Sequence, residues 1–270
     1  MLLSSRSPMP FANAIGVFDS GVGGLSVLRA IRTALPAEDL IYVADSSHAP
    51  YGDKPEAHII QRTLTLGNWL ASSGVKAITV ACNTATVVAI RHLREQTHIP
   101  VVAIEPAIKP AAHTTRSGVV GVLATTQTLQ SESVARLCQE HGEGKRILLQ
   151  ACPGWVEAVE QADLHSSQTE ALLRQFVEPL MEQGVDTLVL GCTHYPFLRD
   201  TLQRIVGDDV TLIDPAVAVA NELARRIDNN RRMDANQIGT TRFFTTGEVA
   251  HVQNAVAHLW GDQAIVEALA

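Results

Sequence analysis

Two stretches of this chain read almost alike, and each ends a short apolar run at a cysteine. They are Ile-Thr-Val-Ala-Cys-Asn-Thr at 78–84 and Leu-Val-Leu-Gly-Cys-Thr-His at 188–194. Each run has strand composition and is followed by a helical pattern, so Cys82 and Cys192 are expected where two parallel strands end. In open α/β sheets ligands bind at that carboxyl edge, and a helix N-terminus there stabilises an anion such as a thiolate. Both thiols are therefore placed for chemistry.

A second pair of segments extends this match. Residues 15–20 resemble residues 120–125, and each segment reads as a strand that ends in a hydroxyl residue. The cysteine segments are 188 − 78 = 110 positions apart and these segments 120 − 15 = 105, so a five-residue length difference reconciles them. We predict an α/β fold of two similar, pseudo-symmetric domains with parallel sheets and an active site in the cleft between them. The composition of buried parallel strands could also produce the likeness without any repeat.

The order of strand and helix patterns divides the chain into four parts. Residues 1–14 are rich in Ser and Pro, lack the apolar core of a signal peptide and are expected to form a loose tail. The first α/β domain is expected over 15–100 and the second over 101–209. The segment 210–270 carries no third cysteine strand, so we expect it to return to the first domain.

Composition excludes several classes of function. Lys and Arg number 21 against 28 Asp and Glu, a net charge of −7 without any basic run, which argues against nucleic acid or an anionic membrane as a primary partner. No stretch of 18 apolar residues predicts a membrane span. The four cysteines show no C-x-x-C or zinc spacing, so we expect reduced thiols in a cytoplasm and no metal site. Cys138 is expected to pack in the core, and Cys152, at a strand end, is ambiguous.

A glycine-rich loop, Asp-Ser-Gly-Val-Gly-Gly at 19–24, follows the first strand. Its glycines let the backbone approach a ligand at a helix start. The spacing nearly matches a dinucleotide fingerprint, which we reject because Asp19 would place a negative charge beside the pyrophosphate. We expect Asp19 near an ammonium group, and Ser20 with the loop amides near a carboxylate. A second loop, 45–54, is long enough to cover a cleft, although a plain surface loop fits its composition equally well.

Two thiols that face one cleft can invert a stereocentre. One cysteine removes the Cα proton and the other returns a proton from the opposite side, which requires no cofactor. A pyridoxal enzyme needs a Schiff-base lysine, and no lysine lies at a comparable strand end. A cysteine hydrolase built on Cys192 and His194 would leave Cys82 without a role. Buried structural cysteines, an amino-acid-binding protein and a thiol redox protein remain as alternatives.

Four motifs carry a resemblance to a known family. They are the loop at 19–24, Ala-Pro-Tyr-Gly at 49–52, Ala-Cys-Asn-Thr-Ala-Thr at 81–86 and Gly-Cys-Thr-His-Tyr-Pro at 191–196. In this order they resemble the aspartate/glutamate racemase family, and within it the glutamate racemases. Aspartate racemases usually continue their second Gly-Cys-Thr with Glu where this chain has His194. That difference favours glutamate over aspartate or a related amino acid.

The resemblance implies cofactor-independent interconversion of L- and D-glutamate, which supplies D-glutamate for bacterial peptidoglycan. It also implies that the substrate lies between the two domains, and we further expect a homodimer. By motif, the substrate-binding residues would be Asp19, Ser20, Pro50, Tyr51, Gly52, Asn83, Thr84, Thr125, Thr193 and His194.

The same resemblance assigns the catalytic roles. Cys82 and Cys192 would be the two bases, assisted by Asp19 and His194 respectively. An acidic residue near the second thiol would be Glu160. Glu157, three positions earlier in the same segment, is a competing candidate for that place.

Overall fold

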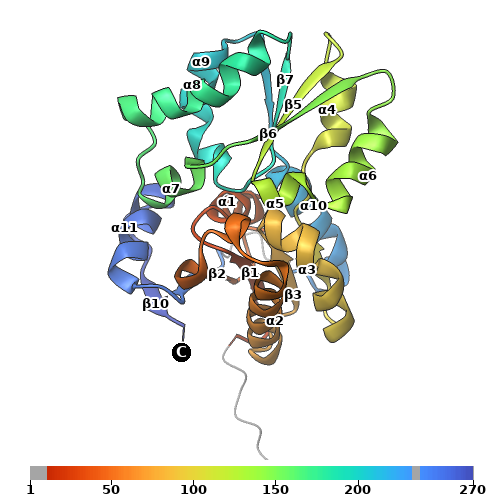
Figure 1. Cartoon of the computed structure of the whole chain (residues 1–270). Helices are drawn as coiled ribbons and strands as arrows, with labels where there is room; N and C mark the ends of the chain where they lie inside the picture. Colours follow the sequence, from red (N-terminus) through yellow and green to blue (C-terminus); the bar gives the residue numbers. More distant parts are fainter. Residues whose placement is uncertain (1–10, 233–237, 270) are drawn as a thin grey trace, which may run out of the picture.

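The computed structural model describes residues 11–232 and 238–269, and these form two α/β domains, each built on a parallel sheet (Figure 1). The larger sheet contains β1 Ile15–Asp19, β2 Leu40–Ala44, β3 Ala77–Val80, β4 Val101–Ala103, β9 Thr241–Thr245 and β10 Val266–Ala268. The smaller sheet contains β5 Val119–Ala124, β6 Arg146–Ala151, β7 Thr187–Leu190 and β8 Thr211–Ile213. Their orders are β10-β9-β2-β1-β3-β4 and β6-β5-β7-β8. The predicted fold of two parallel-sheet domains is confirmed.

The two sheets share one strand order, because β2-β1-β3-β4 corresponds strand for strand to β6-β5-β7-β8. The cysteine strands β3 and β7 each lie beside the first strand of their domain, with Gly16 opposite Ile78 and Gly121 opposite Leu188. These central strands are buried along their whole length and are largely apolar, as expected where helices cover both faces of a parallel sheet. The carboxyl edges of both sheets therefore carry one cysteine at the equivalent place.

The helices cover these sheets and connect successive strands. In the first part of the chain they are α1 Leu25–Ala34, α2 Glu56–Ser72, α3 Asn83–Gln96, α4 Ile108–Thr114, α5 Thr126–Leu129 and α6 Glu132–His141. They continue with α7 Trp155–Glu160, α8 Ser167–Met181, α9 Arg199–Val206, α10 Ala216–Arg226 and α11 Val249–Leu259, and the short 3-10 turns are η1 Ser46–His48, η2 Tyr51–Asp53, η3 Tyr195–Leu198 and η4 Asp228–Asn230. Among the described residues, none of the helices has both the length and the apolar character needed to cross a membrane.

The chain crosses between the domains twice, at 104–107 and at 214–215. Strand β4 pairs with β3 in the larger sheet, and β8 pairs with β7 in the smaller sheet. By strand pairing, β4 belongs to the first domain, although the predicted boundary at 101 placed it in the second. Strand β8 likewise belongs to the second domain, although the predicted boundary at 210 placed it after that domain. Each of these strands completes the sheet of the domain that precedes it in the chain, and the chain crosses to the other domain only after that strand. Strands β9 and β10 then extend the larger sheet beyond β2.

A continuous buried apolar cluster joins the domains. It runs from β1 and α1 through α10 to α7, α8 and β7, so the two sheets share part of one core. Helix α10 packs against α1, although it follows a strand of the smaller sheet. The relative placement of the two sheet edges is therefore supported by packing as well as by the two crossings.

The predicted loose tail differs from the structure where the structure describes it. Phe11 packs its ring against Trp69 and Phe244, with centroids 5.8 and 5.6 Å apart. Its N–H donates to the carbonyl of Ser73 at 3.1 Å, and Ala14 is buried. Burial of this apolar surface holds 11–14 on the first domain. The remainder of the predicted tail, 1–10, lies outside the described residues.

Candidate active site

The two thiols line one small cavity between the domains. Cys82 and Cys192 each stand two residues after the last residue of their strand, and their exposed fractions are 4% and 7%. The cavity has a volume of about 10 Å³, enough for about one water molecule. The residues that line it are Ser20, Pro50, Tyr51, Gly52, Cys82, Asn83, Thr84, Thr125, Val156, Cys192, Thr193 and His194.

This lining includes every residue predicted to bind substrate except Asp19, which lies behind Ser20. It also includes Val156, an apolar residue of α7 that no chemical motif marked in the sequence. None of these lining residues is Lys or Arg. Asn83 is buried, and within the described part of the chain neither its Oδ1 nor its Nδ2 has a hydrogen-bond partner. The cavity thus offers an anionic group neutral donors, including this unpartnered amide, together with the ring of His194.

Cys82 is the N-cap of α3. Its Sγ accepts a hydrogen bond from the N–H of Ala85 at 3.5 Å and lies 3.6 Å from Ser20 Oγ, to which the S–H can donate. Burial raises the pKa of the Cys82 thiol well above its ordinary range, and the negative charge of Asp19 raises it further. Cys82 is therefore held in the protonated form unless a base takes its proton.

Asp19 is fully buried and is held by donors from both domains. Its carboxylate accepts from the N–H groups of Ser20 and Gly24, both at 2.6 Å, and from Thr193 Oγ1 at 3.2 Å. Burial raises the pKa of Asp19, while the charge of His194 opposes that shift. The loop amides expected to meet a ligand carboxylate thus hold a carboxylate of the protein itself.

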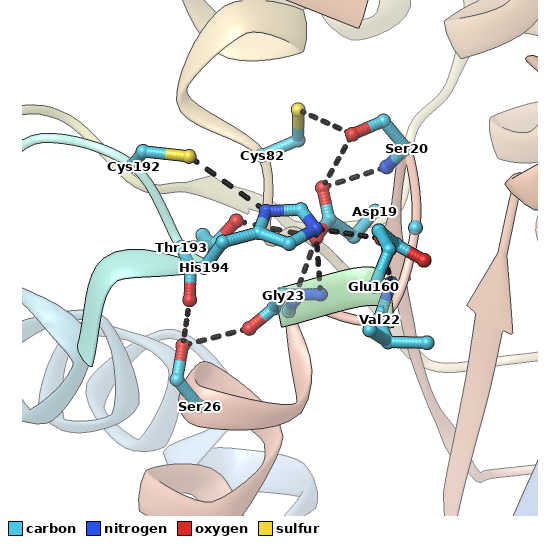
Figure 2. A network of polar contacts seen from close by, with 12 residues as sticks. Asp19, Ser20, Val22, Gly23, Ser26, Cys82, Glu160, Cys192, Thr193 and His194 are labelled. Atoms are coloured by element: carbon cyan, nitrogen blue, oxygen red, sulfur yellow. Dashed lines mark hydrogen bonds and ion pairs between the residues drawn. The ribbon is translucent and has the colours of Figure 1, made fainter. Parts of the chain in front are cut away.

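His194 connects Cys192 to an acid (Figure 2). Its Nδ1 lies 3.7 Å from Cys192 Sγ, and its Nε2 lies 2.7 Å from Glu160 Oε1. Burial alone would lower the pKa of His194, but the hydrogen bonds to Cys192 and Glu160 raise it well above 6.5. The ring is therefore an imidazolium near neutral pH. The N–H of Gly23 lies 3.2 Å from Nε2, but a protonated Nε2 cannot accept, so the shorter carboxylate contact is the hydrogen bond.

Of the two acidic candidates near the second thiol, Glu160 is the one in contact with His194. Its Oε1 also accepts from the N–H of Val22, at 2.8 Å, so a loop of the first domain holds an acid of the second. Glu157 is exposed and lines a neighbouring small cavity. Of the two candidates that the sequence left open, Glu160 and not Glu157 therefore lies beside His194, the neighbour of the second thiol.

The glycines of the loop at 19–24 are required by this close approach. A Cβ at Gly21 would lie 1.8 Å from Glu160 Oε1, and a Cβ at Gly23 would lie 2.2 Å from His194 Nδ1. Sequence reasoning expected these glycines to admit a ligand. They admit instead the side chains of the other domain, a contact between residues more than a hundred positions apart that no local pattern reveals.

The loop at 45–54 forms part of the cavity wall through Pro50, Tyr51 and Gly52. The hydroxyl of Tyr51 donates to Asp45 Oδ2 at 2.5 Å. The same buried carboxylate accepts from Arg62 Nε at 2.9 Å and from Thr246 Oγ1 at 2.8 Å. Tyr51 is thus fixed by Asp45 and Arg62, which the sequence did not single out for any role, and its hydroxyl is already engaged.

The other two cysteines, Cys138 and Cys152, do not line the cavity between the domains. Cys152 is buried at the end of β6, and its Sγ lies 3.5 Å from the carbonyl of Gln150. Cys138, expected in the core, is partly buried in α6 and packs at the edge of a small apolar cluster. Among the described residues, no group of three or more His, Cys, Asp or Glu has the arrangement of a metal site.

Fold and site together define a class of protein: a pseudo-symmetric α/β protein that brings one buried cysteine from each domain to a shared cavity between them. Residues 15–223 match the Asp/Glu/Hydantoin racemase family. The chain belongs to this family.

Individual relatives agree with this membership. The glutamate racemase of Stutzerimonas stutzeri is 49% identical over 257 residues, which cover 95% of this chain and 97% of that protein. The structure of a glutamate racemase isoform of Bacillus anthracis matches with a TM-score of 0.86 and 32% identity, over 96% of this chain and 98% of that one. The Escherichia coli glutamate racemase, solved with L-glutamate and the activator UDP-MurNAc-ala, matches with a TM-score of 0.84 and 31% identity, over 96% and 98%.

Proposed function

We propose that this protein interconverts L- and D-glutamate without a cofactor, by a two-base mechanism. The observation that carries the proposal is the pair Cys82 and Cys192, which follow equivalent strands of two domains and line one cavity. A single base would need no such pairing, whereas inversion at Cα needs a proton acceptor on one face and a donor on the other.

In the direction that starts at Cys192, its thiolate takes the Cα proton and becomes a thiol. The electron pair left on Cα is delocalised into the α-carboxylate, whose growing charge is met by neutral donors such as Asn83. Cys82 then gives its own proton to the opposite face and becomes the thiolate. The reverse direction starts from that state, so the same two groups exchange roles and no net proton is consumed.

Each thiol has a partner for its charge change. The imidazolium of His194 stabilises negative charge on Cys192, and Glu160 keeps that ring protonated. On the other side Asp19 receives or returns the proton of Cys82, either directly or through the hydroxyl of Ser20, which lies 3.2 Å from Asp19 Oδ1. We propose that Cys192 acts first on L-glutamate and Cys82 first on D-glutamate.

Glutamate is proposed as the substrate because the curated relatives at nearly half identity are glutamate racemases, and the Escherichia coli relative was solved with L-glutamate. His194, where aspartate racemases usually carry Glu, supports this choice. The proposal extends to supply of D-glutamate for peptidoglycan, a cytoplasmic location where thiols stay reduced, and a homodimer.

The test incubates purified protein with L-glutamate and no added cofactor while circular dichroism follows the enantiomers. We expect decay to an equal mixture from either hand, unaffected by a chelator, with aspartate turned over slowly or not at all. In deuterated water the product should carry deuterium at Cα while remaining substrate gains little early label. Faster turnover of aspartate, or early label in both pools, would overturn the substrate or the two-base mechanism respectively.

A further inference from the structure

The hydroxyl of Ser26 joins the first turn of α1 to the loop that follows Cys192 (Figure 2). Its Oγ lies 2.9 Å from the carbonyl oxygen of Gly23 and 2.9 Å from that of Thr193, which belongs to the second domain. A serine near a helix start commonly donates to a backbone carbonyl of its own turn, so the contact with Gly23 is ordinary local structure. The contact with Thr193 spans 167 positions and crosses the domain boundary. This second contact is the one that local structure does not explain.

The backbone of the loop after Cys192 shows why the Thr193 carbonyl needs a donor from elsewhere. The carbonyls immediately before and after it each accept from the N–H three positions on, both at 3.1 Å, as in a 3-10 turn. Three positions after Thr193 stands Pro196, which has no N–H to donate. Thr193 is 2% exposed, so its carbonyl is shielded from water as well. Ser26 thus supplies the hydrogen bond that the proline cannot.

The single proton of the Ser26 hydroxyl is needed more by Thr193 than by Gly23. The Gly23 carbonyl also accepts the N–H of Ser26, at 3.0 Å, and has a donor without the hydroxyl. Among the described residues, no other group donates to the Thr193 carbonyl. Because buried carbonyls are almost always paired, the arrangement that satisfies both carbonyls is the one in which the hydroxyl donates to Thr193.

Thr193 is held by the first domain at two points. Its hydroxyl donates to Asp19 Oδ2 at 3.2 Å, and its carbonyl accepts from Ser26 at 2.9 Å. Together these contacts fix the orientation of the peptide that leads into His194. The Nδ1 of that ring lies 3.7 Å from Cys192 Sγ, a contact long enough that a small rotation of the peptide would break it.

We propose that Ser26 is a positioning residue that replaces the missing N–H of Pro196. By holding the Thr193 carbonyl it fixes the following peptide and so keeps the ring of His194 beside Cys192. Ser26 does not line the cavity, and it acts on the reaction only through the loop that it holds. This inference rests on the proposed function, in which His194 assists Cys192.

The experiment measures each thiol separately through the loss of HCl from a β-chloro analogue of glutamate. The thiolate takes the Cα proton, and the electron pair of that bond forms a Cα–Cβ double bond while chloride leaves Cβ, so one abstraction is enough. In a Cys82→Ser background only Cys192 is the base, and in a Cys192→Ser background only Cys82. We expect Ser26→Ala to lower kcat/KM for elimination about tenfold in the first background, the effect of one lost hydrogen bond. In the second background it should stay within about twofold of its parent.

Two control variants separate positioning from helix stability. Ser26→Thr keeps the hydroxyl and should stay within about twofold of its parent in both backgrounds. Thr33 lies in the same helix, and its Oγ1 donates to the carbonyl of Arg29 at 3.0 Å, within that helix. Thr33→Ala should therefore leave both rates unchanged.

Pro196→Ala provides the rescue, because it restores an N–H three positions after Thr193. In a Pro196→Ala protein the further change Ser26→Ala should lower racemisation of glutamate by less than about threefold, against about tenfold in the wild-type protein. The melting temperature of each variant verifies that it is folded. If Pro196→Ala does not fold, the comparison of the two single-cysteine backgrounds decides.

Equal loss in both backgrounds, or no loss in either, overturns the inference, as does a full tenfold effect of Ser26→Ala in folded Pro196→Ala protein. If the single-cysteine variants do not eliminate HCl, racemisation by the Ser26 and Pro196 variants decides in their place. A wild-type protein that does not racemise glutamate would instead overturn the proposed function, so the two failures are distinguishable.

Discussion

The two cysteines stand at equivalent strand ends, yet their surroundings carry opposite charge. Cys82 caps α3 directly and has the carboxylate of Asp19 nearby, which together with burial raises the pKa of its thiol. Cys192 is followed by the turn η3 and not by an α-helix, and the imidazolium of His194 lies 3.7 Å from its Sγ. The strands that lead to the two cysteines repeat, but the charged groups around the thiols do not.

In the proposed two-base mechanism, this difference means that the two proton transfers are not mirror images. Burial and the carboxylate of Asp19 favour the thiol form of Cys82, whereas the imidazolium of His194 lies beside Cys192. The two thiols would therefore exchange their protons next to partners whose charges are opposite to one another.

The largest expected effect comes from removing either thiol. Cys82→Ser and Cys192→Ser should each lower racemisation by about a thousandfold or more, because a hydroxyl cannot exchange roles with a thiolate near neutral pH. Each variant keeps one base and should still eliminate HCl from a β-chloro analogue of one hand. We expect Cys82→Ser to act on the L analogue and Cys192→Ser on the D analogue. Elimination from the same hand by both variants would refute the assignment of faces.

The next effect separates the two partners. We expect His194→Asn to lower kcat about a hundredfold in the direction that starts at Cys192, and Asp19→Asn to impair mainly proton transfer by Cys82. The enantiomers have equal free energy, so kcat/KM must stay equal in both directions for every variant. The asymmetry has to be measured in kcat, with a compensating change in KM. Equal loss of kcat in both directions from both substitutions would contradict separate partners.

A smaller effect is expected at Glu160, which helps to keep His194 charged. Glu160→Gln removes a negative charge and should lower the pKa of His194, so the alkaline limb of kcat should move to lower pH with a roughly tenfold loss near neutrality. Glu157→Gln, an exposed residue of the same helix, is the control and should leave the profile in place. A profile unchanged by Glu160→Gln would show that Cys192 alone holds the proton on His194.

The smallest effect concerns stability, since both partners bind protons more tightly when folded. The pKa of Asp19 is raised from 3.8 and that of His194 from 6.5, so each contributes stability that is full below those values and is lost as pH rises through the raised values. The free energy of unfolding should fall by at most about 1.4 kcal/mol per pH unit in each window. Urea titrations of Asp19→Asn and His194→Asn should lack the corresponding slope. A wild-type slope retained above pH 6.5 in His194→Asn would contradict this origin.

Much of this comparison was accessible from sequence because strands and their ends have local signatures. The buried runs before Cys82 and Cys192 predicted two parallel strands, and the match of the two halves already places Thr84 opposite His194. The loop at 45–54 does line the cavity, but its composition fitted a plain surface loop equally well, so the sequence alone did not decide its role.

The remainder depends on contacts between distant parts of the chain. The hydrogen bond from Val22 to Glu160 joins two domains, and its only local sign is a glycine at 21, a residue equally typical of tight turns and ligand-binding loops. Helices α5 and α6 are separate because Ser131 caps the second, with its Oγ accepting from the N–H of Val134. Strand β10 pairs with β9, and β9 pairs with β2, whose residues lie far away in the chain, so no local pattern predicted this edge of the sheet.

The size of the cavity has a consequence for timing. A space that holds about one water molecule cannot admit an amino acid unless its walls move apart. Because these walls belong to both domains, the crossings at 104–107 and 214–215, which contain Pro106 and Pro215, are the places where the chain would bend. Each turnover therefore includes an opening and a closing step in addition to the proton transfers.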